Sequence, residues 1–288
     1  MLTPVVLGVL GVLLAGPMPR ALSRWTDLRR TPAAGMLLWQ STALAAVLAA
    51  LGAGLSLATD RLWEPPVATA DKLVAVLAGA VTVVVAARLL LSGHRTGTSL
   101  RRMRRLHRER VDLVARVDGG VSVLEDDLPV AYCVPGMTGS RIVVSRSTLA
   151  SLAPAELEAV LAHERSHLRS RHDLVLEAFT VLHRAFPRWV ASGAARREVE
   201  VLVEVLADRA AVRSGDRRAL VSALLALAGS RAPEGSLGSA GSIAARVEVL
   251  RDTGSHRVQA AAVLLVAAAI LALPTLLVVL PWLTGLRS

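Results

Sequence analysis

Two long stretches without a charged residue are the strongest constraint on what this chain can fold into. No Asp, Glu, Lys or Arg occurs between Arg30 and Asp60, or between Arg257 and Arg287. Each stretch exceeds the roughly 20 apolar residues that carry an α-helix across the hydrocarbon core of a bilayer. Two further apolar stretches are shorter, and one of them contains only Arg88, whose long side chain can reach the headgroups. We predict four membrane helices, at about 2–19, 33–59, 73–93 and within 258–288.

The first apolar stretch could instead be a cleaved signal peptide. A signal peptide begins with basic residues and ends at a cleavage site made of small residues. Here the uncharged segment Met1-Leu2-Thr3-Pro4 precedes the stretch, and no convincing small-x-small site follows it. We therefore expect this stretch to be retained as a membrane helix.

Charges between the apolar stretches are distributed unevenly. The segment 20–30 carries four arginines and one acid, the segment 60–72 is balanced, and seven arginines follow within 95–110. Because cytoplasmic loops of membrane proteins carry an excess of Lys and Arg, we expect the N-terminus outside the cell membrane and 94–257 in the cytoplasm. Three regions are expected: 1–93 with three membrane helices, 94–257 as a cytosolic domain, and 258–288 with the fourth helix and a short external tail.

The formal net charge of +10 comes almost entirely from arginine, because the chain contains a single lysine. Such basicity is one feature of nucleic-acid-binding proteins. Here the arginines gather at the expected cytoplasmic ends of the membrane helices, where anionic lipid headgroups account for them. We therefore expect the lipid bilayer as a partner and no direct contact with nucleic acid. The single cysteine, Cys133, excludes an intramolecular disulfide.

Residues 94–257 form the only stretch able to fold as a globular domain. Its first part has the short apolar runs and turn residues of strands, and apolar residues recur at helical spacing from Pro154 onward. The turn-rich segment 135–139 indicates that the last two strands form a hairpin. The predicted elements are a helix at 101–117, strands at 121–124, 129–134 and 141–145, helices from 154 and at 174–186, 194–213, 218–228 and 244–252, and a Gly- and Ser-rich loop at 230–242.

The segment His163-Glu164-Arg165-Ser166-His167 places two histidines four residues apart. On a helix they lie one turn apart on one face, so both imidazoles can reach a single zinc ion at about 2.0–2.1 Å. Glu164 then projects near the ion, where it can take a proton from water and later pass it to a leaving amine. The alternative is a charged helix whose histidines only face solvent, and the amphipathic pattern of this helix weakens that alternative.

A third zinc ligand is available in the helix predicted at 194–213. Two histidines and a glutamate from a later helix are an established catalytic zinc set. Glu204 and Asp208 lie one turn apart, so Glu204 can bind zinc while Asp208 orients a ligating histidine. Glu200 lies one turn before Glu204 on the same face, and spacing alone leaves both glutamates as candidates.

From Tyr132 to Asp208 the chain resembles the BlaR/MecR-type family of integral-membrane zinc metallopeptidases. The matching segments are Cys133-Val134-Pro135-Gly136, Ile142-Val143-Val144-Ser145, Glu156-Leu157-x-x-Val160-Leu161-Ala162-His163-Glu164-x-x-His167, Arg171-His172-Asp173 and Glu204-x-x-Ala207-Asp208, with Arg246-Val247-x-x-Leu250 further along. In that family the glutamate of the E-x-x-A-D motif is the third zinc ligand, which implies Glu204 here.

The resemblance also implies a fold. It is a mainly α membrane protein with four transmembrane helices and a cytosolic α+β zincin domain, of the minigluzincin type, inserted between helices 3 and 4. Full-length antibiotic sensors of that family continue past the fourth helix into an extracellular penicillin-binding domain, whereas this sequence ends at Ser288. The resemblance therefore implies the protease and leaves its input signal open.

Three functions are consistent with these residues. The resemblance implies a regulatory zinc protease that cleaves a cytosolic protein, such as a BlaI/MecI-like winged-helix repressor. A second function is that of an HtpX-like protease degrading damaged membrane proteins, although HtpX-like chains place two membrane helices before the motif and more after it. A third is an inactive receptor or scaffold, which the intact set of His163, Glu164, His167 and Glu204 disfavours.

Substrate is expected to bind at the edge of a sheet. In zincins generally, an edge strand beside the active-site helix pairs with extended substrate backbone. The hairpin at 129–145 is the only strand material just upstream of the helix that carries His163. We therefore expect either Arg141–Ser145 or its partner at 129–134 to supply that edge.

Overall fold

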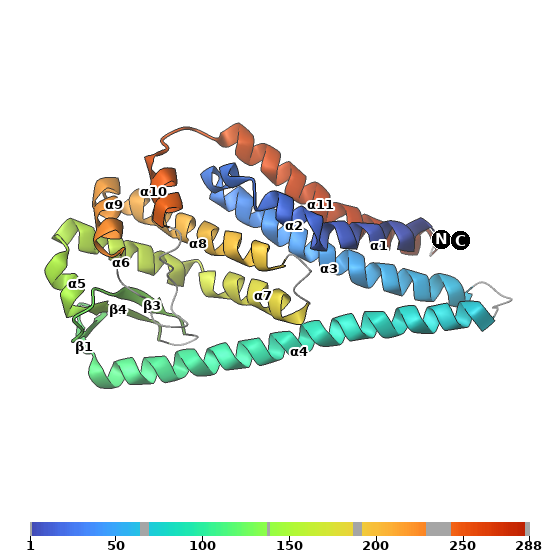
Figure 1. The fold of residues 1–288 in the computed structure, drawn as a ribbon, viewed down its shortest axis with the longest axis horizontal. Helices are drawn as coiled ribbons and strands as arrows, with labels where there is room; N and C mark the ends of the chain where they lie inside the picture. Colours follow the sequence, from blue (N-terminus) through green and yellow to red (C-terminus); the bar gives the residue numbers. More distant parts are fainter. Residues whose placement is uncertain (1, 64–68, 137–138, 187–191, 229–242, 286–288) are drawn as a thin grey trace. The chain divides into compact units, whose positions relative to one another are not determined.

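The computed structural model describes residues 2–63, 69–136, 139–186, 192–228 and 243–285. The described chain is mostly helical, with one small four-stranded sheet (Figure 1). It divides into two units, each described by itself below. The helical unit comprises Met1–His94, Phe179–Val199 and His256–Ser288, and the sheet unit comprises Arg95–Ala178 and Glu200–Ser255.

The helices agree closely with the predicted ones in the second half of the chain, where the predicted bounds are within two residues of the observed bounds. The predicted loop at 230–242 lies outside the described residues. The helices are α1 (Leu2–Ala15), α2 (Pro17–Leu22), the 3-10 helix η1 (Thr26–Arg30), α3 (Pro32–Trp63), α4 (Thr69–Val114), α5 (Arg146–Ser151), α6 (Pro154–Arg169), α7 (His172–Ala185), α8 (Ser192–Ser214), α9 (Arg217–Ala226), α10 (Ile243–Arg251) and α11 (Arg257–Gly285).

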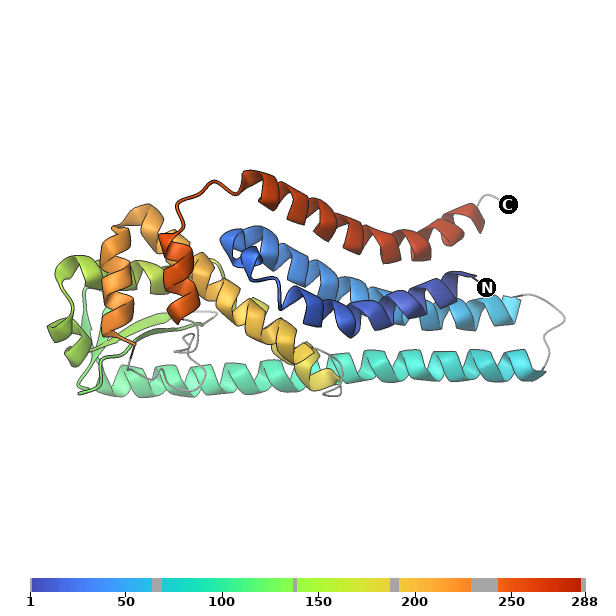
Figure 2. The ribbon, with the colours of Figure 1, turned by 45° about the horizontal axis from the view of Figure 1, so that its top comes forward.

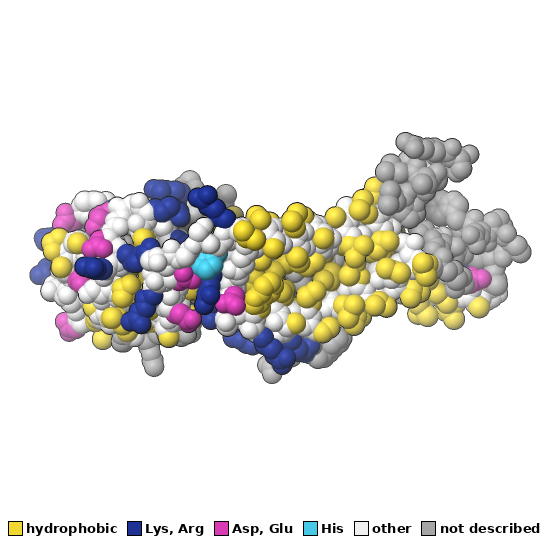
Figure 3. All heavy atoms as spheres, turned by 90° about the horizontal axis from the view of Figure 1, so that it is seen from above, with side chains coloured by type: hydrophobic (Ala, Val, Ile, Leu, Met, Phe, Trp, Pro, Cys, Tyr) yellow, Lys and Arg dark blue, Asp and Glu magenta, His cyan; other side chains and the backbone are white. Residues whose placement is uncertain are grey.

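Four helical segments are long and apolar enough to cross a membrane. They are Leu2–Leu22, Pro32–Thr59, Thr69–Val114 and Arg257–Val279. Their surface supports the same conclusion, because Leu2, Leu90 and Val258 are at least three-quarters exposed. Figure 3 shows hydrophobic side chains gathered over one face of these helices. In water, so large an exposed apolar area would make the protein associate with other apolar surfaces, whereas lipid tails solvate it. The chain is therefore a membrane protein.

Within the helical unit, α3 lies beside both α1 and α11 (Figures 1 and 2). A glycine permits this packing, since a Cβ atom at Gly52 would lie only 2.6 Å from Val278 Cγ2. Polar contacts bind the end of α7 and the start of α8 into the same unit. Ser92 Oγ donates to the carbonyl oxygen of Val181 at 2.8 Å, and Arg29 forms an ion pair with Glu198 at 2.7 Å.

One helix, α4, runs unbroken for 46 residues. The prediction of a membrane helix at 73–93 and a separate helix at 101–117 is therefore wrong about the break. Gly97 lies between the two predicted helices, and a Cβ atom there would lie 2.9 Å from Arg101 Nη1 and from Glu177 Oε1. Glycine at this position leaves room for the Glu177 carboxylate, and the helix continues through Gly97.

The sheet has the strand order β1-β2-β4-β3. Its strands are β1 (Arg116–Asp118), β2 (Val121–Leu124), β3 (Ala131–Val134) and β4 (Arg141–Ser145). β3 and β4 pair antiparallel, which confirms the predicted hairpin. β1 occupies residues expected in the preceding helix, and the turn from β1 to β2 uses Gly119 and Gly120, whose φ angles of 54° and 81° favour glycine.

The position of each strand in the sheet decides which one has a free edge. β4 pairs with β2 on one side and with β3 on the other. The expectation that Arg141–Ser145 might supply the substrate edge is therefore wrong, because both sides of that strand are hydrogen-bonded. Among the described strands, β3 pairs with β4 alone. The open edge of the sheet on this side is therefore Ala131–Val134.

Different helices cover the two faces of the sheet. Val111 of α4 packs with Tyr132 and Val143 on one face, and Val160 of α6 belongs to the cluster that contacts Ala131 on the other. α6 begins as predicted at Pro154, where the Glu156 carboxylate accepts a hydrogen bond from the Ala153 N–H at 2.8 Å. On this face α6 packs mainly against β3, the strand with the open edge.

Candidate metal centre

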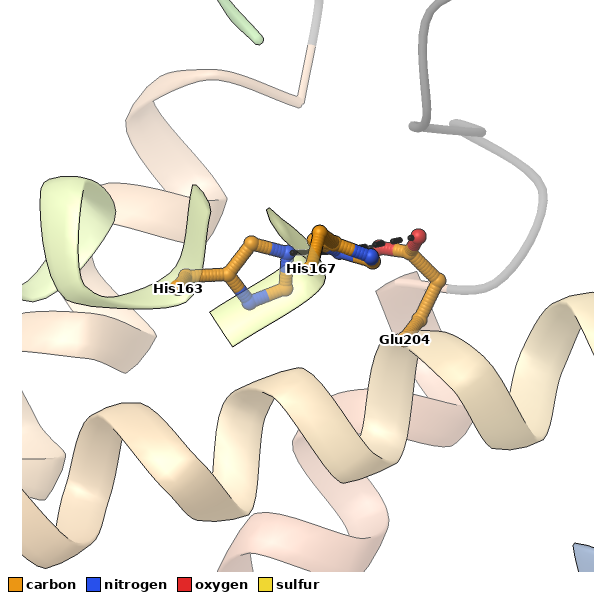
Figure 4. A group of neighbouring side chains, drawn as sticks. All are labelled: His163, His167 and Glu204. Atoms are coloured by element: carbon orange, nitrogen blue, oxygen red, sulfur yellow. Dashed lines mark hydrogen bonds and ion pairs between the residues drawn. The ribbon is translucent and has the colours of Figure 1, made fainter. Parts of the chain in front are cut away.

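Three side chains from two helices converge inside the sheet unit. His163 and His167 lie one turn apart on α6, and Glu204 lies on α8 (Figure 4). The exposed fractions of the three side chains are 8%, 0% and 6%. The two imidazole Nε2 atoms are 3.0 Å apart, and the Glu204 carboxylate oxygens lie 3.5 Å from His163 Nε2 and 3.6 Å from His167 Nε2.

These separations fit one metal ion held by all three residues. Two ligand atoms at about 2.0–2.1 Å from a tetrahedral zinc ion lie roughly 3.3–3.4 Å from each other. The three measured separations fall on either side of that value. Imidazole nitrogen and carboxylate oxygen are also the ligands that catalytic zinc sites use. The donor set and its spacing therefore suit zinc.

The Nδ1 atom of each histidine lies close to a polar side chain. Asp208 Oδ1 lies 2.9 Å from His163 Nδ1, and the Asp208 side chain is 1% exposed. An Nδ1–H that donates to this carboxylate leaves the lone pair of His163 on Nε2, which faces Glu204. His172 Nδ1 lies 3.1 Å from His167 Nδ1, so the second imidazole is also fixed in orientation.

Arg246 of α10 completes the site, and it had no predicted role there. Its guanidinium donates to both carboxylate oxygens of Asp208, from Nη2 at 2.6 Å and from Nε at 2.8 Å. Its Nη1 lies 3.0 Å from Glu204 Oε2. In the sequence, the only indication of this residue is its place in a segment that matches the BlaR/MecR-type family. Arg246 and Asp208 are 38 residues apart, so the fold alone brings them together.

Glu164 is buried on α6 beside the three residues. Its Oε2 atom has no hydrogen-bond partner within the described part of the chain. Burial raises the pKa of Glu164 to about 7, while the neighbouring His163 acts to lower it and Glu204 to raise it further. A carboxyl group that titrates near neutral pH can accept a proton in one step and return it in the next.

The pKa of Glu204 moves the opposite way. Burial acts to raise it, but the hydrogen bond to His163 and the nearby His167 and Arg246 outweigh burial and lower it. The pKa of Asp208 is also lowered, because hydrogen bonds from Arg246 and His163 outweigh its burial. Glu204 is therefore ionised at neutral pH, as a metal ligand must be.

The structure also separates the two glutamates that spacing left open. Glu204 belongs to the group of side chains whose ligand atoms lie within 4.8 Å of one another. Glu200 is half-buried one turn earlier on α8 and does not belong to that group.

Metal content should distinguish these two glutamates. His163→Ala, His167→Ala and Glu204→Gln should each weaken zinc binding by about tenfold or more, because each removes one of three protein ligands. Glu200→Gln is the matched control and should keep full zinc occupancy. Zinc per chain is measured by atomic emission on purified protein whose helicity matches that of the unmodified chain. Full occupancy in Glu204→Gln together with loss in Glu200→Gln would reverse the assignment.

Arg246→Gln should lower zinc affinity by about 10- to 100-fold, the usual effect of losing a residue that orients metal ligands. Arg246→Lys should recover part of the affinity, because lysine keeps the positive charge. It should not recover all of it, because lysine cannot make the bidentate hydrogen bond with Asp208. The measurement is competition with a chelator of known affinity. Arg251→Gln on the exposed face of the same helix is the control. Unchanged affinity in Arg246→Gln would exclude a positioning role.

A comparison with known families gives the site its context. The profile of peptidase family M48 matches residues 101–253, more than half of the chain. The matched stretch contains His163, His167, Glu204 and Arg246. No curated protein and no solved structure matches the chain. The chain therefore belongs to peptidase family M48, a family of metallopeptidases.

Proposed function

We propose that this protein is a membrane-bound zinc endopeptidase that hydrolyses peptide bonds of a cytosolic protein. One observation carries the proposal. His163, His167 and Glu204 form a buried set of ligand atoms within 4.8 Å, and Glu164, next to His163 on α6, has a carboxylate oxygen without a partner among the described residues. A buried carboxylate oxygen without a partner is costly in a purely structural role, whereas an enzyme needs it free for proton transfer.

In this proposal each residue has a separate task. His163, His167 and Glu204 hold zinc, which when bound polarises the scissile carbonyl group and lowers the pKa of water. Glu164 accepts the proton from the attacking water and delivers it to the leaving amine. Asp208 and Arg246 keep His163 and Glu204 in place, and His172 does the same for His167.

The open edge of β3 is the proposed substrate-binding strand. The N–H of Ser145 donates to the carbonyl oxygen of Val130 at 2.9 Å, which fixes the register of the hairpin. Along an antiparallel strand, residues alternate between bonding to the partner strand and pointing away from it. By this alternation the N–H and C=O groups of Ala131 and Cys133 point away from β4. An extended peptide can pair with them next to α6.

The finer role that we propose is regulatory proteolysis. The resemblance to the BlaR/MecR-type family supports a winged-helix repressor of the BlaI/MecI kind as substrate. The excess of arginines at 20–30 and 95–110 supports a cytoplasmic location of residues 94–257, inserted between membrane regions at 1–93 and 258–288. The alternative is an HtpX-like role in degrading damaged membrane proteins, and the next experiment distinguishes it from regulatory proteolysis.

Glu164→Gln should keep zinc and abolish proteolysis, because it preserves the ligands and removes the proton acceptor. The inactive full-length chain should then retain uncleaved substrate when it is isolated from cells. Mass spectrometry of the retained proteins, with His163→Ala as the control that lacks a zinc ligand, separates the two roles. One soluble DNA-binding protein supports regulation, and many unrelated membrane proteins support the HtpX-like role. Proteolysis by purified Glu164→Gln would contradict the mechanism itself.

Proline substitutions should separate substrate pairing from folding. Ala131→Pro removes an N–H that points away from β4, so peptide turnover should fall about fivefold or more while zinc content is unchanged. Ile142→Pro and Val144→Pro break the ladder between β4 and β2, and Val134→Pro breaks the ladder between β3 and β4. These three should lose zinc and turnover together. Ala131→Ser, which keeps the N–H, is the control. If Ala131→Pro loses zinc and turnover in step, β3 is structural and does not bind substrate.

A further inference from the structure

A cavity of about 510 Å³ lies within the helical unit. The described residues that line it come from α1, α2 and α3 and from the parts of α7 and α8 that belong to this unit. The lining is apolar apart from Trp39, Thr42 and Arg20. The hydroxyl of Thr42 already donates to the carbonyl oxygen of Leu38 at 2.8 Å. Among the described lining residues, Arg20 is the charged one, and its Nη1 also donates to the carbonyl oxygen of Gly16 at 3.0 Å.

The cavity is long for its volume, which suits a thin chain. Its lining on α3 extends from Trp39 to Ala53, which is about 21 Å at 1.5 Å per residue. A cavity of this length and volume takes a narrow, flexible, apolar molecule.

The charge at one end identifies the class of molecule. The lining begins at Gly8 in the apolar part of α1 and reaches Arg20, beyond the end of that helix. Arg24 lies one turn further along and is exposed. Arginines next to a membrane helix attract anionic lipid headgroups. One leaflet of the hydrocarbon core is roughly 15 Å deep, half of the full thickness, so a lipid tail spans most of the cavity.

We propose that this cavity binds one acyl chain of an anionic phospholipid from the surrounding bilayer, with the phosphate at Arg20. The acyl chain contacts Phe179 and Leu182 of α7 and Phe186 just after this helix, all of which line the cavity. This site is separate from the candidate metal centre, and the inference does not depend on peptidase activity.

Trp39 provides a direct measurement of occupancy. It lines the cavity and is only 1% exposed, so a lipid must lie within the cavity to come close to its ring. In the full chain, the other four tryptophans are replaced by phenylalanine. The protein is then placed in phosphatidylcholine bilayers that contain a small fraction of phosphatidylglycerol brominated on its acyl chains. Bromine quenches indole fluorescence on contact, so Trp39 emission should fall as the brominated lipid is added.

Substitutions decide whether the quenching comes from the cavity. Ala46→Phe fills the cavity and should remove most of the quenching, whereas Ala80→Phe, on an exposed face of α4, should not change it. Arg20→Gln should weaken the preference for phosphatidylglycerol over brominated phosphatidylcholine about fivefold, and Arg20→Lys should restore it. No quenching of Trp39, or equal quenching in Ala46→Phe and the unmodified cavity, would overturn the proposal. Equal quenching by the two brominated lipids would overturn the anionic specificity.

Discussion

Two carboxylates one turn apart, Glu204 and Asp208, are buried at 4% and 1% exposure, and the rest of the sheet unit depends on how their charges are compensated. Two like charges at this spacing repel each other, and each loses its hydration on burial. Arg246 contacts both of them, and His163 lies against both as well. These contacts join α6, α8 and α10, so the interaction that shapes the site also holds the three helices together. Removing one partner from such a buried group typically costs about 3–5 kcal/mol of stability.

The charged groups around a buried carboxylate also explain why two buried glutamates differ in pKa. Glu204 and Glu164 are both almost inaccessible, yet the pKa of Glu204 is lowered and that of Glu164 is raised to about 7. Glu204 has cationic neighbours that stabilise its charge. Burial dominates at Glu164, where one carboxylate oxygen has no partner among the described residues. Pairs of titratable groups whose environments shift their pKa values apart are typical of acid–base sites. One glutamate is thereby suited to remain an anion and the other to exchange a proton.

The parts of the structure that were predictable from the sequence are those with local signals. Apolar stretches with at most one charged residue predicted the four candidate membrane helices, and a four-residue spacing put His163 and His167 on one face of a helix. Where the signal is not local, the prediction failed. α4 continues through Gly97, where Glu177, a residue 80 positions away, approaches the helix, and no pattern near Gly97 indicates this contact. Spacing could not separate Glu200 from Glu204 because both lie at one-turn intervals on α8. Arg246 reaches the site only through the fold.

The open edge of β3 also determines what kind of protein can be cut, if it receives substrate as an added strand. A folded domain has its backbone hydrogen bonds satisfied internally, so it must open locally before a segment can pair with β3. When opening and closing are fast compared with cleavage, the rate of cutting is proportional to the fraction of time that the segment is open. Each additional 1.4 kcal/mol of local stability in the target then slows cleavage about tenfold. Two proteins with identical cleavage sequences would have different lifetimes, set by the folding of the target rather than by the enzyme.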